Sequence, residues 1–245
     1  MTRHIPKWPV LLAPVLAFSL GAAPRNGEEI ELEEAKVFVE FNSTDMDFGI
    51  QFFWDGVAWK TMKIEGPDGH TVLKVSARRN LRQQGLTEGF FESAEPPASI
   101  LSMAQFFERF PEGTYEFEGD TLEGDELVGE TEFTHTLPAP PANLFPASGA
   151  VVNALNPLVA SFDAVTQDLA GNPLVPELYE VIVEADHPTL GEIAFTVVLE
   201  GDVANPSATV PPEFLHPGME YKLEVIAQAE GGNRTIAEVS WTTAP

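Results

Sequence analysis

Short runs of alternating apolar and polar residues, separated by turn-forming residues, dominate this sequence and limit its possible folds. Val37, Val39 and Phe41 recur at every second position, and residues 48–54 alternate in the same way. Successive side chains of a β-strand point to opposite faces, so a period of two gives each strand one buried face. Gly, Pro, Asp and Asn between the runs are typical of turns between strands. The pattern predicts an all-β chain.

A proline-rich run divides the chain into two parts. With 245 residues, of which 44% are hydrophobic, the chain is long enough for two small domains, each with its own core. Residues 137–142 read Leu-Pro-Ala-Pro-Pro-Ala, and such runs form extended, semi-rigid spacers. We therefore predict an N-terminal β-sandwich domain over residues 24–137, a linker over 138–142 and a second β-sandwich over 143–245.

The first half contains turn signals and one helix signal. Asp55-Gly56 predicts a tight hairpin turn, and residues 66–69 predict a second turn. Ser102 followed by Gln105 is typical of a capping box at the start of a helix. An apolar stripe follows, and a proline and a glycine end it. The sequence predicts one short helix that closes an end of the first sandwich.

The N-terminus resembles a secretory signal peptide. Arg3 and Lys7 precede an apolar stretch over residues 8–20, and Gly21 and Ala23 have the spacing of a signal peptidase site. A membrane anchor is the alternative, but two prolines interrupt the stretch and it is shorter than the roughly 20 residues that span a bilayer. We predict a signal peptide over residues 1–23, cleaved near Ala23, and a periplasmic or secreted protein without a membrane span.

Charge and cysteine content exclude several functions. The chain has 13 basic and 38 acidic residues, a net charge of −25, so phosphate backbones and anionic lipids are repelled and nucleic-acid binding is not expected. Without cysteine there is no disulfide, thiolate nucleophile or thiolate metal site. A cysteine-free exported chain is typical of bacteria.

One segment of the second half carries a specific fold signal. Residues 215–221 read Leu-His-Pro-Gly-Met-Glu-Tyr, and an alternating strand follows. This segment resembles the passage from strand E to strand F of fibronectin type III domains, and the resemblance covers about residues 142–245. It implies a seven-stranded sandwich with structural roles for Leu215, Pro217 and Gly218, and it makes Tyr221 the corner tyrosine, whose hydroxyl bonds to the upstream backbone. The fold itself names no function.

The first half resembles a group of bacterial exported proteins of uncharacterised function. The resemblance rests on residues 42–49, 90–96 and 110–115, which read Asn-Ser-Thr-Asp-Met-Asp-Phe-Gly, Phe-Phe-Glu-Ser-Ala-Glu-Pro and Phe-Pro-Glu-Gly-Thr-Tyr. It implies no activity.

The strongest candidate for a metal site lies between two predicted strands. Asn42, Asp45 and Asp47 supply oxygen ligands of the kind that calcium prefers, and alternating aspartates bring two carboxylates together. Glu92 and Glu95, in another polar loop, are candidate distant ligands. The alternative is an Asx turn in which these side chains bond their own backbone. We predict no cofactor other than calcium.

An aromatic cluster surrounds the predicted hairpin. Phe53, Trp54 and Trp59 lie close together, and Phe53 points away from the face that holds Trp54. An exposed aromatic face binds sugar rings in many β-sandwich modules. The alternative is a second layer, such as the helix, that covers this face.

No motif of catalysis is present. The sequence has no nucleophile elbow, zinc-protease motif or phosphate-binding glycine loop, although a pair of carboxylates of the glycosidase type is recognised only in space. We therefore expect a monomeric, non-enzymatic exported module that contacts protein or glycan. The alternatives are a calcium-binding structural module near Asp45 and Asp47, and a carbohydrate-active enzyme or its accessory domain.

Overall fold

The structure is a computed structural model that describes residues 27–245. The predicted signal peptide, residues 1–23, lies outside the described residues. Strands dominate the described chain, which confirms the all-β prediction. No helix in this part is long and apolar enough to cross a membrane. The elements are β1 (Glu29–Glu31), β2 (Glu34–Asn42), β3 (Asp47–Glu65), β4 (Thr71–Ser76), α1 (Arg79–Gln84), β5 (Leu86–Glu92), α2 (Met103–Arg109), β6 (Gly113–Thr121), β7 (Glu126–Phe133), β8 (Ala142–Phe145), β9 (Val151–Val152), β10 (Leu158–Asp163), β11 (Leu178–His187), β12 (Gly191–Glu200), β13 (Ser207–Val210), η1 (Pro212–Phe214), β14 (Glu220–Gln228) and β15 (Arg234–Thr243).

The first half is organised around β3, a strand of 19 residues. Its first part pairs with β2 and β5, and its second part pairs with β4 and β6. β7 and β1 extend the sheet beyond β6. The sheet curls around one hydrophobic core, in which Trp54, Trp59 and Phe117 are fully buried.

The prediction of a hairpin turn at Asp55-Gly56 is wrong, because β3 continues through both residues. The pairing of β3 with β5 shifts register between Asp55 and Trp59, and a bulge of this kind bends a strand and increases its twist. Gly56 fits here because a Cβ would lie 3.0 Å from the Leu32 side chain. Without the shift, Trp54 and Trp59 would face opposite sides of the sheet; instead their rings pack at 5.6 Å.

The helix predicted after Ser102 is present as α2, with its capping box. The Ser102 hydroxyl accepts the Gln105 N–H, and the Gln105 side chain accepts the Ser102 N–H. Phe106 of this helix packs edge-on against Phe48 at 5.0 Å, so the helix closes one end of the first core. Helix α1 was not predicted because it has no buried residue and no side-chain cap.

The second half is a sandwich of two sheets. Strands β12-β11-β14-β15 form one layer and β13-β10-β8 form the other. In the lettering of fibronectin type III domains these layers correspond to C′-C-F-G and E-B-A, as the resemblance implies. The inner faces of the two layers enclose a second hydrophobic core, in which Tyr179, Leu223 and Trp241 are fully buried.

The Tyr221 hydroxyl bonds to the segment before β14. It donates to a backbone carbonyl seven residues upstream at 3.0 Å and accepts the His216 N–H at 2.7 Å. Leu215 is buried in the second core, Pro217 is exposed, and Gly218 has a φ of 71°, which favours glycine. This is the geometry of a tyrosine corner.

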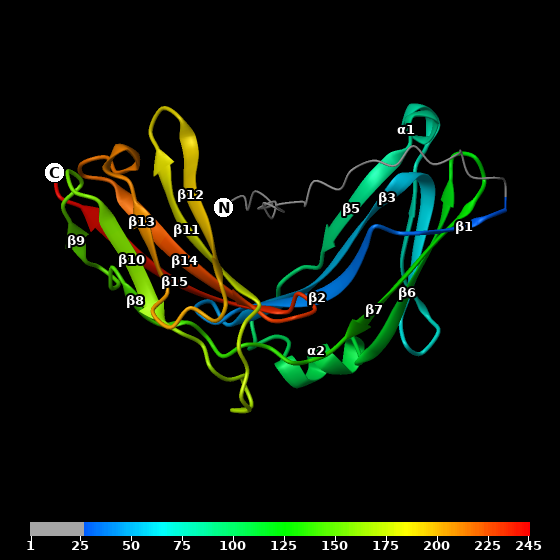
Figure 1. Cartoon of the computed structure of the whole chain (residues 1–245), viewed down its shortest axis with the longest axis horizontal. Helices are drawn as coiled ribbons and strands as arrows, with labels where there is room; N and C mark the ends of the chain where they lie inside the picture. The colour runs from blue at the N-terminus through cyan, green and yellow to red at the C-terminus, as the bar shows by residue number, and fades with distance from the viewer. Residues whose placement is uncertain (1–26) are drawn as a thin grey trace.

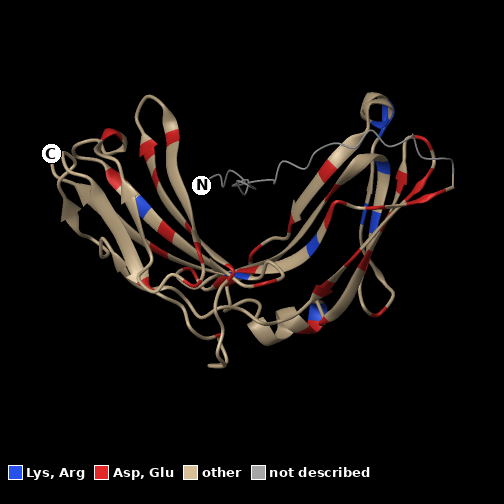
Figure 2. Ribbon diagram, viewed as in Figure 1, with Lys and Arg blue, Asp and Glu red and all other residues tan. Residues whose placement is uncertain are grey.

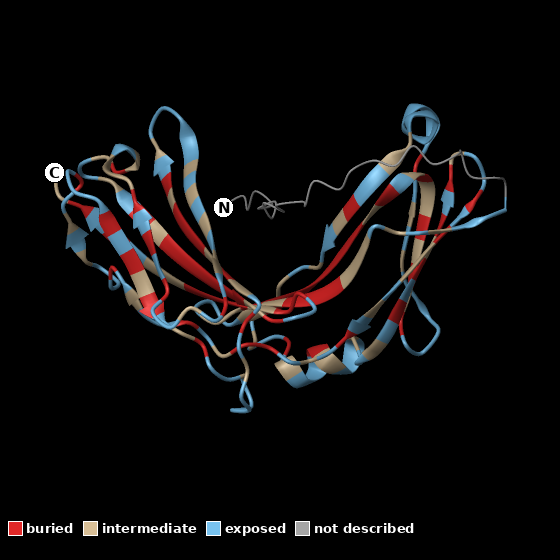
Figure 3. Cartoon of the chain, viewed as in Figure 1, coloured by how far each residue is buried: buried red, intermediate tan, exposed pale blue. Residues whose placement is uncertain are grey.

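The two halves share one sheet. β15 and β2 pair in parallel, with Arg234 opposite Glu40 and Ile236 opposite Asn42, and this pairing unites both halves in a 12-stranded sheet. Figure 1 shows the sheet as a V with β2 and β15 near its base, and with β8, β10, β13 and α2 on its outer side. Figure 3 shows that buried residues continue across the base. The V therefore has a concave face opposite both cores.

Candidate functional site at the junction of the two halves

Three glutamates meet on the concave face where the two halves join. Glu40 lies on β2, Glu92 ends β5 and Glu95 follows β5. Their carboxylate oxygens lie within 4.8 Å of one another. Gln51, the register partner of Glu92, donates a side-chain hydrogen bond to the Glu92 carboxylate at 3.0 Å. We call Glu40, Glu92 and Glu95 the junction carboxylates.

Gly49 provides the space that Glu95 occupies. It is the partner of Glu40 in the pairing of β2 with β3. A Cβ at Gly49 would lie 3.0 Å from Glu95 Cγ and 3.2 Å from Ser93 Oγ. The Ser93 hydroxyl accepts the Ile50 N–H at 3.1 Å and holds this segment against the strand. The close approach of Glu95 to the other carboxylates therefore requires glycine, which has no side chain, at position 49.

Arg234 neutralises part of the charge of the cluster. Its Nη1 lies 3.8 Å from Glu40 Oε2, and the two side chains are only 11% and 19% exposed. The guanidinium also lies over the Phe38 ring at 4.5 Å. Burial raises the pKa of Glu40, and Arg234 partly opposes this rise. Burial lowers the pKa of Arg234, and the charge of Glu40 opposes that change.

Glu95 is a second junction carboxylate with a raised pKa. Burial, followed by the charges of Glu40, Glu92 and Asp47, raises the pKa of Glu95 to about 8. Glu95 therefore binds a proton at neutral pH. Converging carboxylate oxygens are also the ligands of hard cations, so a divalent cation would compete with this proton.

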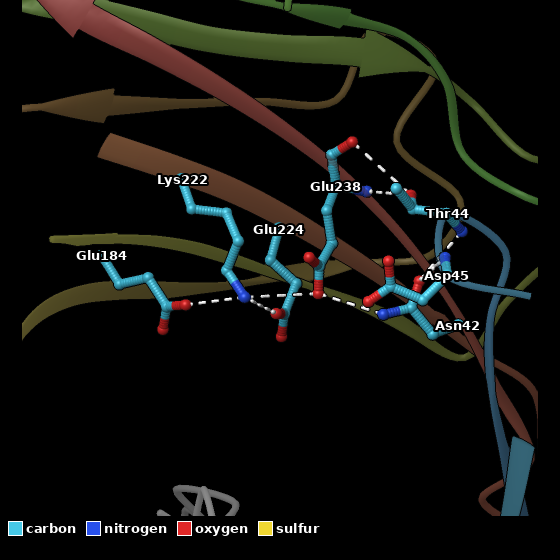
Figure 4. A network of polar contacts seen from close by, with 7 residues as sticks. All are labelled: Asn42, Thr44, Asp45, Glu184, Lys222, Glu224 and Glu238. Atoms are coloured by element: carbon cyan, nitrogen blue, oxygen red, sulfur yellow. Dashed lines mark hydrogen bonds and ion pairs between the residues drawn. The ribbon is translucent and has the colours of Figure 1, made fainter. Parts of the chain in front are cut away.

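A second polar network extends along the concave face from the cluster (Figure 4). Lys222 Nζ lies 2.8 Å from Glu184, 3.4 Å from Glu224 and 3.3 Å from Glu238. Burial alone would lower the pKa of Lys222, but its hydrogen bond to Glu184 and the charges of Glu224 and Glu238 raise this pKa above its usual value. One lysine thus forms ion pairs with three glutamates, so the concave face has more negative than positive charge.

The residues predicted as a calcium site do not all lie together in the structure. Asn42 Oδ1 accepts the N–H groups of Thr44 at 2.9 Å and Asp45 at 3.2 Å, which forms an Asx turn. The other amide atom of Asn42, Nδ2, donates to a β15 glutamate at 3.2 Å. Asp45 is exposed, whereas Asp47 lies near enough to Glu95 to raise its pKa. Glu92 belongs to the junction carboxylates.

The prediction of an exposed aromatic face at Phe53, Trp54 and Trp59 is wrong. These side chains are 6%, 0% and 1% exposed. Trp54 and Trp59 belong to the first core, where Trp54 stacks on Phe91 with ring centroids 5.4 Å apart. Phe53 lies on the concave side, with Lys36 Nζ 5.9 Å from its ring centre. Alternation already places Trp54 on the core side, and the bulge turns Trp59 to the same side.

A second acidic region lies away from the junction. An open groove of about 660 Å³ is lined by six glutamates and five other residues of the first half, and Glu116 and Glu118 belong to this lining. Carboxylate oxygens of Glu65, Glu116 and Glu118 also lie within 4.8 Å of one another. Lys63 contacts Glu118 at 2.5 Å and Glu65 at 3.2 Å. The ammonium group of this lysine therefore already pairs with two of these carboxylates.

Sequence reasoning did not find Glu40. Glu40 and Phe38 face away from the first core between Val37, Val39 and Phe41, so a charged residue within the apolar stretch 37–41 was the available signal. The residues that surround Glu40 come from strands that are far apart in the sequence, and only the folded sheet brings them together.

No family model and no curated protein matches this sequence. Among solved structures, the FN1-FN3 domains of chicken CNTN1 align with 89% of this chain and 66% of that chain, at 11% identity and a TM-score of 0.36. Alpha-2-macroglobulin of Escherichia coli activated by porcine elastase aligns over 86% of this chain and 20% of that chain, at 12% identity and a TM-score of 0.35. A tetra-tandem repeat in the extending region of a large adhesion protein aligns over 85% and 49%, at 14% identity and a TM-score of 0.29. The chain thus spans less than two thirds of each of these structures.

Proposed function

We propose that the protein is a non-enzymatic binding module of the cell exterior, and that its concave face contacts a cationic segment of a partner protein. The observation that carries the proposal is the acidic surplus of this face (Figure 2). Strand register places many glutamates there, against Arg234, Lys222 and Lys36. They include Glu40, Glu92, Glu95, Glu180, Glu184, Glu224 and Glu238. The exterior location rests on the predicted signal peptide.

A protein partner fits this face better than a glycan. Sugar-binding sandwiches present aromatic rings to solvent, and the aromatic residues between positions 52 and 59 are buried. The concave face instead offers carboxylates, and the isoleucines between them, Ile182, Ile226 and Ile236, are already buried. Lysine and arginine side chains complement such a surface because their charged heads bind carboxylates.

An octalysine peptide tests this proposal by isothermal titration calorimetry. The triple variant Glu92→Gln, Glu184→Gln, Glu238→Gln removes charge from the concave face but keeps side-chain shape. We expect its dissociation constant for octalysine to rise at least tenfold. The matched control changes Glu65, Glu116 and Glu118 to Gln and should alter the constant less than threefold. Equal weakening by the two triple variants would show that only net charge matters and would contradict the proposal.

Calcium binding by the junction carboxylates is the second candidate function. Its support is the convergence of three carboxylates within 4.8 Å, with Asp47 nearby. We expect calcium to raise the melting temperature by several degrees relative to a chelator, because a ligand of the native state stabilises it. Glu92→Gln should abolish this rise and Glu118→Gln should retain it. An equal rise in both variants would place calcium elsewhere.

The carbohydrate-active alternative has weaker support. Glu92 and Glu95 are close together, as a carboxylate pair requires, but Arg234 binds the neighbouring Glu40. No aromatic platform faces solvent among residues 52–59. Reducing-sugar release from soluble polysaccharides, lost in Glu95→Gln, is the result that would favour an enzyme over a binding module.

A further inference from the structure

Strand β12 leaves one edge of the large sheet open. In the part of the chain that the structure describes, β12 is the terminal strand and pairs only with β11, over all ten of its residues and without a register shift. An edge strand presents N–H and C=O groups that can pair with another strand. Figure 1 shows β12 on the side of the β11–β12 hairpin that faces the opening of the V.

This edge lacks the features that usually prevent strand pairing. Proteins protect edges with short strands, prolines, lysines or bulges. The opposite edge of the sheet is protected in this way, because β1 has three residues with Glu29 and Glu31 at its ends. β12 has ten residues, contains neither proline nor lysine, and pairs with β11 without a bulge.

The core beside β12 is also incompletely covered. Four apolar side chains of β12 pack against the second core but remain only half-buried: Ile193, Phe195, Val197 and Leu199. Their partners on β11 are more deeply buried; Val183, for example, pairs with Phe195 and is 0% exposed. An added strand with apolar residues at alternate positions would bury these side chains further.

Charge determines what kind of strand fits. Exposed Glu192 and Glu200 flank an uncharged stretch, residues 193–199. A second copy of β12 in antiparallel pairing about Thr196 would place Glu192 opposite Glu200 twice, and like charges directly opposite are destabilising. A foreign strand with a basic residue at each end would form two favourable pairs instead.

We propose that β12 binds an extended segment of a partner protein by strand addition, and that this segment has alternating apolar residues between two basic residues eight positions apart. The backbone supplies affinity, and Glu192 and Glu200 set the register. Glu192 and Glu200 lie by register on the same face of the sheet as Glu184. Strand addition uses the backbone edge of β12, however, so this proposal does not depend on the cationic partner of the concave face.

The capped peptide Lys-Val-Thr-Val-Thr-Val-Thr-Val-Lys is the probe, and the same peptide with Glu at both ends is its control. Fluorescence anisotropy should give at least tenfold tighter binding of the lysine peptide. Amide hydrogen exchange should slow in residues 192–200 when this peptide binds. The double variant Glu192→Lys, Glu200→Lys, at two exposed positions, should reverse the preference between the peptides.

Two results separate this proposal from the others. The triple variant of the concave face, with Glu92, Glu184 and Glu238 changed to Gln, should bind the lysine peptide within threefold of the unchanged protein. Slowed exchange outside β12, or a preference that the double variant does not reverse, would overturn strand addition. Sedimentation should show a monomer; a dimer in which amide hydrogen exchange slows in residues 192–200 would show that a second copy occupies this edge.

Discussion

At the scale of single residues, Asn233 holds the junction together. Its side chain is buried and makes three hydrogen bonds to backbone. Oδ1 accepts the Val39 N–H of β2 at 2.9 Å, and Nδ2 donates to the carbonyl oxygens of Thr134 at 2.8 Å and Thr136 at 3.0 Å. One residue that precedes β15 thus joins β2 to the segment that leads into the second half.

Asn233→Ala should destabilise the protein by about 3 kcal/mol, because it leaves buried backbone groups without partners. Urea denaturation of the variant and the unchanged protein measures this difference. Asn172→Ala is the matched control, since Asn172 is exposed and its side chain bonds only Asp168; it should cost less than about 1 kcal/mol. A loss for Asn233→Ala as small as that of the control would contradict the structural role.

Gly49→Ala should change the chemistry of the junction carboxylates more than the stability of the fold. The new Cβ would lie 3.0 Å from Glu95 Cγ, and the flexible Glu95 side chain would move toward solvent. The pKa of Glu95 should then fall from about 8 toward its ordinary value. Carboxyl-carbon NMR titration measures this pKa, and an unchanged value would show that Gly49 does not position Glu95.

At the scale of elements, the two helices differ in what fixes them. α2 has a capping box and buries Phe106, whereas α1 has neither a side-chain cap nor a buried residue. Ser102→Ala should therefore cost about 1 kcal/mol, and Arg78→Ala, at the N-cap of α1, should be close to neutral. Denaturant midpoints of the two variants provide the comparison, and equal losses would argue against the cap.

Sequence reasoning worked for elements whose signals are local. The cap at Ser102, the turn at residues 66–69 and the strand alternation depend on neighbouring residues, so they could be predicted. The path of β3 could not, because Asp55-Gly56 is typical of a hairpin turn and only pairing with distant strands shows a bulge. The same bulge brings Trp59 to the core side beside Trp54, and the burial of both residues removed the predicted sugar-binding face.

At the scale of the whole molecule, the junction depends on contacts between residues far apart in the chain. Arg234 pairs with Glu40 across the parallel strands β15 and β2, although nearly the whole chain separates them. No local pattern predicts such a pair, because its strands belong to different halves. The proline-rich run at residues 137–142 predicts a spacer between these halves. In the structure, the Pro138 carbonyl accepts a hydrogen bond from Thr235 Oγ1 at 2.7 Å.

The junction should also make stability depend on pH. Burial and neighbouring charges raise the pKa of Glu95 to about 8, and burial raises the pKa of Glu40. The folded protein therefore holds a proton that the unfolded chain releases near its ordinary value of 4.5. This contribution to stability is fully present below pH 4.5, and it declines as the pH rises through about 8.

We expect the melting temperature to fall between about pH 4.5 and about pH 8, and Glu95→Gln to flatten this part of the profile, because glutamine is neutral at every pH. Glu118→Gln changes the net charge equally at high pH but lies away from the junction, so it should keep the slope of the unchanged protein. If both variants keep that slope, the proton is not held at Glu95. If both flatten it, general repulsion within a chain of net charge −25 causes the pH dependence. Loss of slope in Glu95→Gln alone would locate the proton at the junction carboxylates.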